Sequence, residues 1–292
     1  MIKLSYTDVL EAFRSLSMKE QLLLMQELQA GLPARTPYGH AITARTRREM
    51  RRFICEQDPN VMAWMRGFEP DEVLYEIGAN CGGVVLAAAA LHTRLRIVAI
   101  EPSYSNFESL ARNVTLNNLT NVIPLQIALL DRTGILPMNY RDTAPGASLH
   151  GVGSTVDHVG QSFDPAAVQQ MPTYKLDDLI GCLQLPTPTR LLIDVDGYEE
   201  AVLRGAMATL TSGTVRDLVV EIVNHDGVGT RVAAIGTLLD SVGFRFLEAF
   251  EHEATGGREH SIVADYHFAR ADVPLIGSST NGVSVVAGER RL

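Results

Sequence analysis

The chain has 292 residues, a formal net charge of −9 at pH 7, 46% hydrophobic residues and 20% charged residues. This composition is typical of a globular protein and excludes a disordered or fibrous chain. The acidic balance disfavours general binding to nucleic acid, because that affinity comes from Lys and Arg side chains that neutralise phosphates. We therefore expect no nucleic-acid partner.

The three cysteines, Cys55, Cys81 and Cys182, are far apart and form no CxxC pair. They predict neither a disulfide framework nor a zinc site, and they favour a reducing compartment. The first residues lack the pattern of a signal peptide, and no stretch reaches the roughly 18–20 apolar residues of a membrane span. We expect a cytoplasmic protein that does not bind membranes.

The first part of the chain, residues 1–70, is predicted to be an N-terminal helical extension. Residues 7–31 carry apolar side chains at helical spacing, and a capping-box pattern at Ser17 and Glu20 predicts two helices there. Residues 32–40 contain two prolines and are predicted to be a linker.

A basic helix is predicted over residues 43–57, and a short helix over 60–67 follows it. The arginines between residues 45 and 52 are interpreted as the solvated face of the basic helix, because a run of like charge usually faces water.

From residue 73 onward, strands alternate with helices, which predicts a mostly parallel sheet covered on both faces. The predicted strands lie at 73–78, 96–101, 122–130, 135–140, 172–176, 190–195 and 218–223. The predicted helices lie at 83–91, 106–116, 177–182, 199–210 and 231–242. Residues 141–171 show no clear periodicity and are predicted to be a long functional or mobile loop.

The last two apolar stretches, 244–249 and 261–268, have no helical pattern between them and are predicted to pair as an antiparallel hairpin. The predicted fold is therefore α/β, with a Rossmann-like, mostly parallel sheet that ends in this hairpin. We predict one domain over residues 71–271 and a disordered tail over 272–292.

The most informative stretch is Glu76–Gly82 (EIGANCG), which joins an apolar strand to an alanine-rich helix. Glycine lets a backbone approach a ligand closely and adopt a positive φ. A strand, a glycine turn and a helix in this order predict a nucleotide-binding pocket.

Two nucleotides are candidates for this pocket. A dinucleotide fingerprint, G-x-G-x-x-G, would need a glycine where this chain has Asn80. Glu76 would repel a diphosphate but suits the cationic amino group of S-adenosylmethionine. Glu101 ends the next strand, where an acid that accepts both ribose hydroxyls is expected for either ligand. These residues favour S-adenosylmethionine, and a nicotinamide-dependent oxidoreductase stays open as the alternative.

Further motifs follow in order between residues 74 and 210. They are Glu101-Pro102 with Asn106-Phe107, Asp131–Gly134 (DRTG), Leu176–Leu179 (LDDL) and Ile193–Glu199 (IDVDGYE). Together with EIGANCG, this series resembles the FkbM family of S-adenosylmethionine-dependent methyltransferases. The resemblance implies a class I methyltransferase fold and methyl transfer to an oxygen, commonly a hydroxyl on a sugar or another small metabolite.

We expect the donor to be held by six residues near the ends of the first two strands of the domain: Glu76, Gly78, Asn80, Gly82, Glu101 and Asn106. The first four are predicted to surround the methionine end. Glu101 is predicted to bind the ribose, and Asn106 to lie near the adenosine.

A hydroxyl acceptor benefits from a general base. The carboxyl ends of the strands should bring Asp194, Glu221 and His225 beside the donor, and we predict these three as catalytic. Asp194 lies in an apolar run where burial is costly without a purpose, and His225 titrates near neutral pH. No metal site is predicted, although the same residues with Asp196 could instead hold Mg²⁺ or Mn²⁺.

A third hypothesis is a non-catalytic domain that binds S-adenosylmethionine as a sensor or scaffold, with the N-terminal helices as its partner surface. The small-molecule acceptor and the oligomeric state have no motif that identifies them.

Overall fold

The computed structural model describes residues 6–54, 58–157, 160–224, 229–251 and 262–272. The predicted catalytic residue His225 and nearly all of the predicted tail over 272–292 lie outside these ranges.

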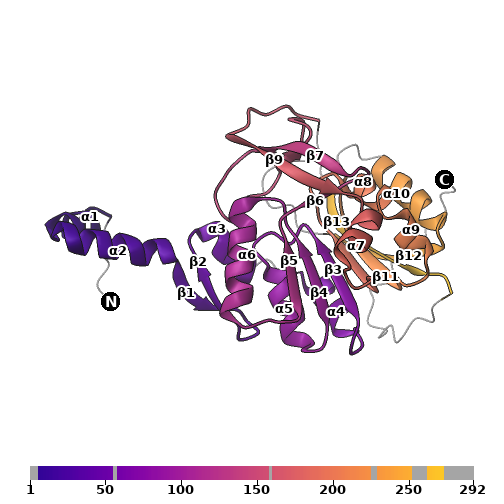
Figure 1. Ribbon diagram of the computed structural model, residues 1–292, viewed down its shortest axis with the longest axis horizontal. Helices are drawn as coiled ribbons and strands as arrows, with labels where there is room; N and C mark the ends of the chain where they lie inside the picture. The colour runs from indigo at the N-terminus through magenta and orange to yellow at the C-terminus, as the bar shows by residue number, and fades with distance from the viewer. Residues whose placement is uncertain (1–5, 55–57, 158–159, 225–228, 252–261, 273–292) are drawn as a thin grey trace.

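A seven-stranded sheet forms the centre of the molecule, in the order β12-β13-β11-β10-β3-β4-β5 (Figure 1). Five strands are parallel: β3 (Val73–Ile77), β4 (Arg96–Ile100), β5 (Val122–Leu125), β10 (Arg190–Ile193) and β11 (Asp217–Asn224). β13 (Ile262–Arg270) runs antiparallel to β11 and to the edge strand β12 (Phe244–Glu251). The predicted fold class, including the C-terminal antiparallel hairpin, is confirmed.

Helices cover both faces of this sheet, which is why its parallel strands read as continuous apolar runs. One face packs against α4 (Pro59–Arg66), α5 (Gly83–Leu91) and α6 (Tyr104–Leu116). The other face packs against α7 (Leu176–Leu183), α8 (Glu199–Arg204), α9 (Met207–Thr211) and α10 (Thr230–Asp240). β3 is buried on both sides, with Leu74 in one core and Tyr75 in the other.

A second sheet lies above the carboxyl ends of the central strands, in the order β6-β9-β7-β8 (Figure 1). Its strands are β6 (Ala128–Leu129), β7 (Gly134–Tyr140), β8 (Gly151–Val152) and β9 (Ala167–Tyr174). The single strand predicted over 122–130 is therefore two strands in two sheets. The prediction of one long loop over 141–171 was wrong for residues 167–171, which belong to β9. The sequence of β9 mixes polar and apolar residues, and it forms a strand because it pairs with β7.

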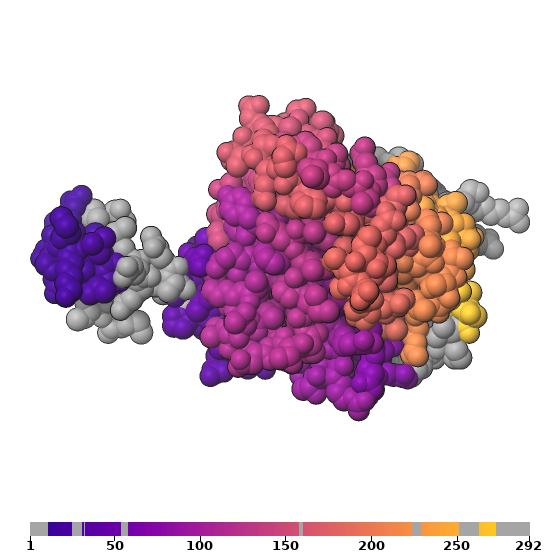
Figure 2. Space-filling model, viewed as in Figure 1, coloured from indigo at the N-terminus to yellow at the C-terminus, as the bar shows by residue number. Residues whose placement is uncertain are grey.

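The N-terminal helices α1 (Tyr6–Ser15) and α2 (Met18–Ala30) stand apart from the rounded body of the molecule (Figure 2). The predicted break between them is confirmed, because the backbone N–H of Ser17 donates to the Glu20 carboxylate at 2.9 Å.

The prediction of a linker over 32–40 was wrong for its first residues, which form β1 (Leu32–Arg35). This strand pairs with β2 (Ala41–Ala44) as an antiparallel hairpin. The hairpin is held by side chains distant in the sequence. The N–H groups of Ala41 and Thr43 donate to the side-chain oxygens of Asn117 and Asn113 on and after α6, at 2.8 and 3.0 Å.

A buried ion-pair network joins the amino ends of three central strands. Arg190, the first residue of β10, forms two hydrogen bonds with the Glu72 carboxylate, at 2.9 and 3.0 Å, and also contacts Asp217, the first residue of β11. Trp64 of α4 donates to the same Asp217 at 3.1 Å. These charges lie at the edge of the sheet opposite the glycine turn.

We predict that Arg190→Ala lowers the free energy of unfolding by about 3–5 kcal/mol, because it removes the cation that Glu72 and Asp217 share and leaves Glu72 only its contact with the more exposed Arg216. Urea denaturation measures this change. The matched control is Arg204→Ala, which breaks an exposed ion pair with Glu200 within one helix and should cost less than about 0.5 kcal/mol. Equal losses in the two variants would contradict the structural role of Arg190.

Candidate functional site

The glycine turn after β3 packs tightly against the neighbouring strands. The N–H groups of Gly78 and Ala79 both donate to the carbonyl of Ile100 at the end of β4, at 2.9 and 3.0 Å. Gly78 has φ +97°, and a Cβ there would lie 1.7 Å from the carbonyl oxygen of Asp194. The close approach that requires glycine at this position is therefore to the end of β10, whereas the sequence interpretation assigned it to a ligand.

Glu76 is buried within this arrangement, with 4% of its surface exposed. Its Oε2 atom is fully enclosed and has no hydrogen-bond partner among the residues that the structure describes. Burial raises the pKa of Glu76 well above its usual range, and the charges of Asp194 and Glu101 raise it further. A buried carboxylate oxygen of this kind is stabilised by a cationic or hydrogen-bonding ligand.

Glu101 follows β4 and accepts hydrogen bonds through both carboxylate oxygens. One oxygen accepts from the Asn80 N–H at 2.9 Å, and the other from the Ser103 N–H at 2.8 Å and the Asn106 side chain at 3.4 Å. Burial raises the pKa of Glu101 to about 7, although these hydrogen bonds oppose the rise. The carboxylate is thus held rigidly beside the glycine turn.

Asn106 and Asn80 connect this turn to the segment that precedes β8. The Asn106 side chain donates to the Ala147 carbonyl at 2.9 Å and accepts from the Gly146 N–H at 2.8 Å. Asn80 donates to the same Ala147 carbonyl at 3.3 Å. The long loop predicted over residues 141–171 is therefore fastened directly to residues predicted to bind the donor.

Asp194, directly after β10, and Glu221, within β11, lie side by side, because Ile193 pairs with Val220. β10 ends at Ile193, so Asp194 opens the loop that follows it. Asp194 is accessible to solvent, yet the surrounding protein and the charge of Asp196 raise its pKa to about 7. The Asp194 charge is also the largest reason that the pKa of Glu221 lies well above its usual value. The two carboxyl groups are hydrogen-bonded and favour sharing a proton.

Asp265 is a further acid of this group that the sequence interpretation missed. It lies on β13 directly opposite Glu221 and is 4% exposed. Its charge raises the pKa of both Asp194 and Glu221. The available signal was a single acid within an otherwise apolar strand, but only the antiparallel pairing shows that it joins the site.

Asp196 lies in the same loop after β10, and its charge raises the pKa of Asp194, Glu221 and Glu101. It has φ +52°, and its carboxylate accepts from the Leu149 N–H at 2.6 Å. Asp196 thus fastens the loop before β8 a second time, as a turn residue.

Among the residues that the structure describes, no three or more His, Cys, Asp or Glu side chains are grouped so that they could hold a metal ion. Within the same ranges, no helix is long and apolar enough to cross a membrane.

This sheet order, with acids at the ends of the first two parallel strands and a glycine turn between them, defines a class I methyltransferase. Residues 76–246 match the Methyltransferase FkbM domain. The chain belongs to this family of methyltransferases, and the resemblance seen in the sequence motifs is confirmed.

Several known proteins are similar to the chain. Methyltransferase 1 of Beauveria bassiana is 28% identical over 189 residues, which cover 61% of this chain and 74% of that protein. Hexuronic acid methyltransferase AglP of Haloferax volcanii is 29% identical over 160 residues, 55% of this chain and 59% of AglP. 31-O-demethyl-FK506 methyltransferase FkbM of Streptomyces tacrolimicus is 25% identical over 215 residues, 67% of this chain and 81% of that protein.

Among solved structures, Methyltransferase FkbM from Methylobacillus flagellatus matches with a TM-score of 0.45 and 16% identity, over 68% of this chain and 44% of that one. The match with AglP likewise spans less than two thirds of AglP's length.

The raised pKa values predict a pH-dependent stability of the ligand-free protein. The pKa of Glu101 is about 7 in the folded state and about 4.3 in an unfolded chain, so the folded state holds a proton that the unfolded state releases between these values. This contribution to the free energy of unfolding is fully present below about pH 4 and is lost as the pH rises through about 7.

We expect Glu101→Gln to flatten the dependence of the free energy of unfolding on pH between about pH 5 and 7, as measured by urea denaturation. Asp131→Asn, at an exposed position, is the control and should leave the slope unchanged. An unchanged slope in the Glu101 variant would show that Glu101 does not hold the proton.

Proposed function

We propose that the chain is an S-adenosylmethionine-dependent O-methyltransferase that acts on a hydroxyl of a small molecule such as a sugar. The observation that carries the donor assignment is the enclosed Glu76 carboxylate, whose Oε2 has no partner within the described structure. The ammonium group of S-adenosylmethionine supplies the positive charge and the hydrogen-bond donors that this oxygen lacks. Membership of a methyltransferase family supports the same donor.

The residues of the turn have distinct roles in this proposal. Glu76 with Gly78, Asn80 and Gly82 surrounds the methionine end, and Glu101 accepts from the ribose hydroxyls. The Glu101 oxygen that accepts from the Asn80 N–H has lone-pair capacity for a further hydrogen bond, whereas the other oxygen already accepts two. Asn106 positions Glu101 and the segment at Gly146, and so forms the wall on the adenosine side.

Two other functions are less well supported. A nicotinamide-dependent oxidoreductase would place a pyrophosphate beside Glu76 and would need glycine at position 80, where this chain has Asn80 with φ +47°. A non-catalytic sensor would not need Asp194, Glu221 and Asp265 to be gathered beside the donor turn, where their mutual repulsion is unfavourable.

The bound donor would supply an electrophilic methyl group on a sulfonium, and the acceptor oxygen must lose a proton as it attacks. Asp194, paired with Glu221, is proposed to receive that proton, because a carboxyl group with a pKa raised to about 7 is a base near neutral pH. Holding the acceptor in line accounts for much of the remaining acceleration. His225 stays a predicted alternative base.

The names of two relatives guide the choice of acceptor. AglP is named for hexuronic acid, and the protein of Streptomyces tacrolimicus for 31-O-demethyl-FK506. We propose a neutral hydroxyl acceptor, because the cluster of acids around Asp194 would repel a carboxylate.

A cytoplasmic location is part of the proposal. Cys81 and Cys182 both carry free thiols, which persist in a reducing compartment.

We expect isothermal titration to show that S-adenosylmethionine binds and that NAD does not. Glu101→Gln should weaken binding of the donor by about 10–100-fold, because a charged acceptor of two ribose hydroxyls is lost. Asp131→Asn again serves as the control. Failure of the wild-type chain to bind S-adenosylmethionine would sink the proposed function.

We expect Asp194→Asn to lower turnover by about 10²–10⁴-fold in a labelled-methyl assay against a panel of sugars and other hydroxyl compounds, while donor binding persists. His225→Ala tests the alternative base in the same assay, and Asp164→Asn, an exposed position, is the control. Wild-type turnover in the Asp194 variant would remove it from the mechanism. Loss of turnover on addition of a chelator would instead indicate a metal-dependent reaction.

A further inference from the structure

The segment that joins β7 to β8, residues 141–150, is fastened to groups at the carboxyl end of the central sheet, and we call it the strap. Near its middle, the Ala147 carbonyl accepts from the Asn80 and Asn106 side chains beside the glycine turn. Near its end, a backbone N–H donates to Asp196 in the loop after β10. The strap therefore extends from the glycine turn to the loop that holds the proposed base.

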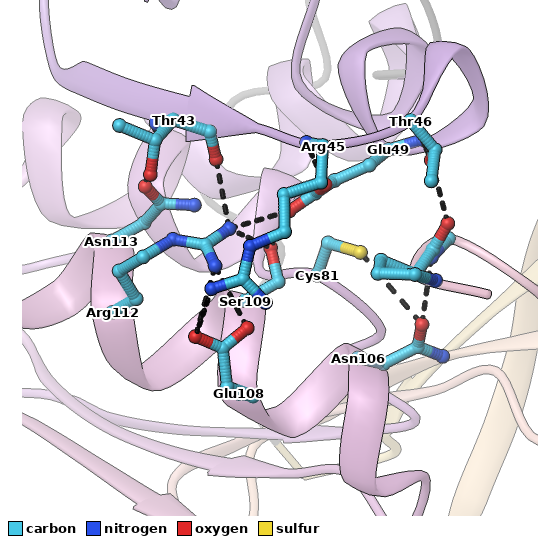
Figure 3. A network of polar contacts seen from close by, with 12 residues as sticks. Thr43, Arg45, Thr46, Glu49, Cys81, Asn106, Glu108, Ser109, Arg112 and Asn113 are labelled. Atoms are coloured by element: carbon cyan, nitrogen blue, oxygen red, sulfur yellow. Dashed lines mark hydrogen bonds and ion pairs between the residues drawn. The ribbon is translucent and has the colours of Figure 1, made fainter. Parts of the chain in front are cut away.

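The start of the strap is held by the segment around α3 (Arg47–Ile54). The hydroxyl of Thr46, directly before α3, donates to the Pro145 carbonyl at 2.8 Å (Figure 3). α3 is itself fixed to α6, because the buried Glu49 carboxylate accepts from Arg112 at 2.8 Å. The solvated face predicted for the arginine run is confirmed, except at the half-buried Arg52, by the exposed side chains of Arg45, Arg47, Arg48 and Arg51.

His150 is the last residue of the strap, and its ring is held on two sides. The Nδ1 atom accepts from the Arg141 backbone N–H at 3.3 Å. The ring packs against the Tyr140 ring, with their centroids 5.2 Å apart. Tyr140 is fixed in turn, because its hydroxyl accepts from the Tyr104 N–H at 3.2 Å. The orientation of the imidazole is therefore defined by the fold.

The hydrogen bond at Nδ1 decides which nitrogen of His150 carries the proton. Burial lowers the pKa of His150, against the charge of Asp196, so the imidazole is neutral near pH 7. A neutral imidazole has one N–H, and the nitrogen that accepts a hydrogen bond cannot be the one that carries it. The proton is therefore on Nε2, which is enclosed and has no hydrogen-bond partner in the described parts of the chain. A buried donor without an acceptor is unfavourable, and a ligand oxygen would satisfy it.

The neighbours of His150 are fastened to the loop that carries the proposed base. The N–H groups of Leu149 and Val152 donate to two side chains of the loop after β10, at 2.6 and 2.8 Å. Asp194 is the first residue of that loop. His150 therefore lies on the part of the strap that meets the Asp194 loop, whereas Ala147 lies on the part that meets the glycine turn.

We propose that His150 donates its Nε2–H to an oxygen of the acceptor and so holds the acceptor beside Asp194. The inference rests on the proposed function and narrows its substrate class. A donor on the attacking oxygen would stabilise the lone pair that must reach the methyl group, and ground-state stabilisation of this kind does not accelerate the reaction. The partner of Nε2 is therefore a second oxygen of the acceptor, and the substrate is a compound such as a sugar, in which a hydroxyl or ether oxygen lies next to the methylated hydroxyl.

The test uses two variants that each keep one half of the hydrogen bonding of the imidazole. His150→Asn has an oxygen that replaces Nδ1 as acceptor but no donor at the position of Nε2, whereas His150→Gln has an N–H donor near the position of Nε2. In the labelled-methyl assay with the sugar panel, His150→Asn should raise KM for the methylated sugar by about 5–50-fold. His150→Gln should stay within about threefold of the wild type, as should the exposed control Asp164→Asn. KM for S-adenosylmethionine should change by less than about threefold in all three variants.

Deoxy analogues of the methylated sugar give a second measurement on the same proteins. Removal of the oxygen that His150 binds should raise KM of the wild type by about the same factor as His150→Asn, and it should have almost no effect on the Asn variant. A deoxy series that affects the wild type and the Asn variant equally would overturn the inference.

The two His150 variants also distinguish binding from structural support. If His150→Asn keeps the wild-type KM and His150→Gln loses it, His150 serves only the Arg141 backbone, and the inference is overturned while the proposed function stands. Wild-type KM values in both variants overturn it in the same way. If the wild-type chain methylates no member of the panel, the proposed function is overturned and the inference with it.

Discussion

The contact between Gly78 and the carbonyl of Asp194 is the constraint on which the site depends. No side chain fits between these two backbones, since a Cβ would lie 1.7 Å from the carbonyl oxygen. This approach joins the end of β3 to the end of β10 and so brings Glu76 close to Asp194, 118 positions away in the sequence. The N–H groups of the same turn donate hydrogen bonds to the Ile100 carbonyl, and this contact places Glu101 beside the turn. Three strand ends are thereby assembled around one glycine.

The electrostatic consequence is a concentration of acids whose negative charges repel one another. Glu76, Glu101, Asp194 and Glu221 all have pKa values raised by burial or by one another's charge. Ligand-free, such a group is stabilised by retained protons. A ligand that brings a positive charge relieves the same repulsion. The affinity for such a ligand therefore depends on how many of these acids are protonated. The position of the glycine turn is held by neutral side chains, because Asn80 and Asn106 both donate hydrogen bonds to the Ala147 carbonyl.

Only part of the chain before β3 stands apart from the body of the molecule. α1 and α2 stand away from the body, whereas β2 and α3 are held to α6 through Asn113, Glu49 and Arg112 (Figures 1 and 3). The buried Glu49 carboxylate and the partly buried Arg112 guanidinium form an ion pair that fixes the register of α3. The end of α3 (Arg47–Ile54) thus packs against Gly83, although α3 lies outside the stretch that matches the family domain.

The order of strands and helices after residue 73 was predictable from the sequence, because apolar runs alternating with helical patterns have few other solutions than a parallel sheet. The acids at Glu76, Glu101 and Asp194 were predictable for the same reason, since the carboxyl ends of parallel strands share one edge. Only the tertiary structure decided that β9 is a strand, that Asp265 lies opposite Glu221 and that the backbone carbonyl of Arg52 packs against Gly83. Each of these depends on partner atoms brought from about 30 or more positions away, such as β7 for β9, β11 for Asp265 and Gly83 for Arg52. A local pattern contains no information about such partners, because the contact is created by the folding of the whole domain.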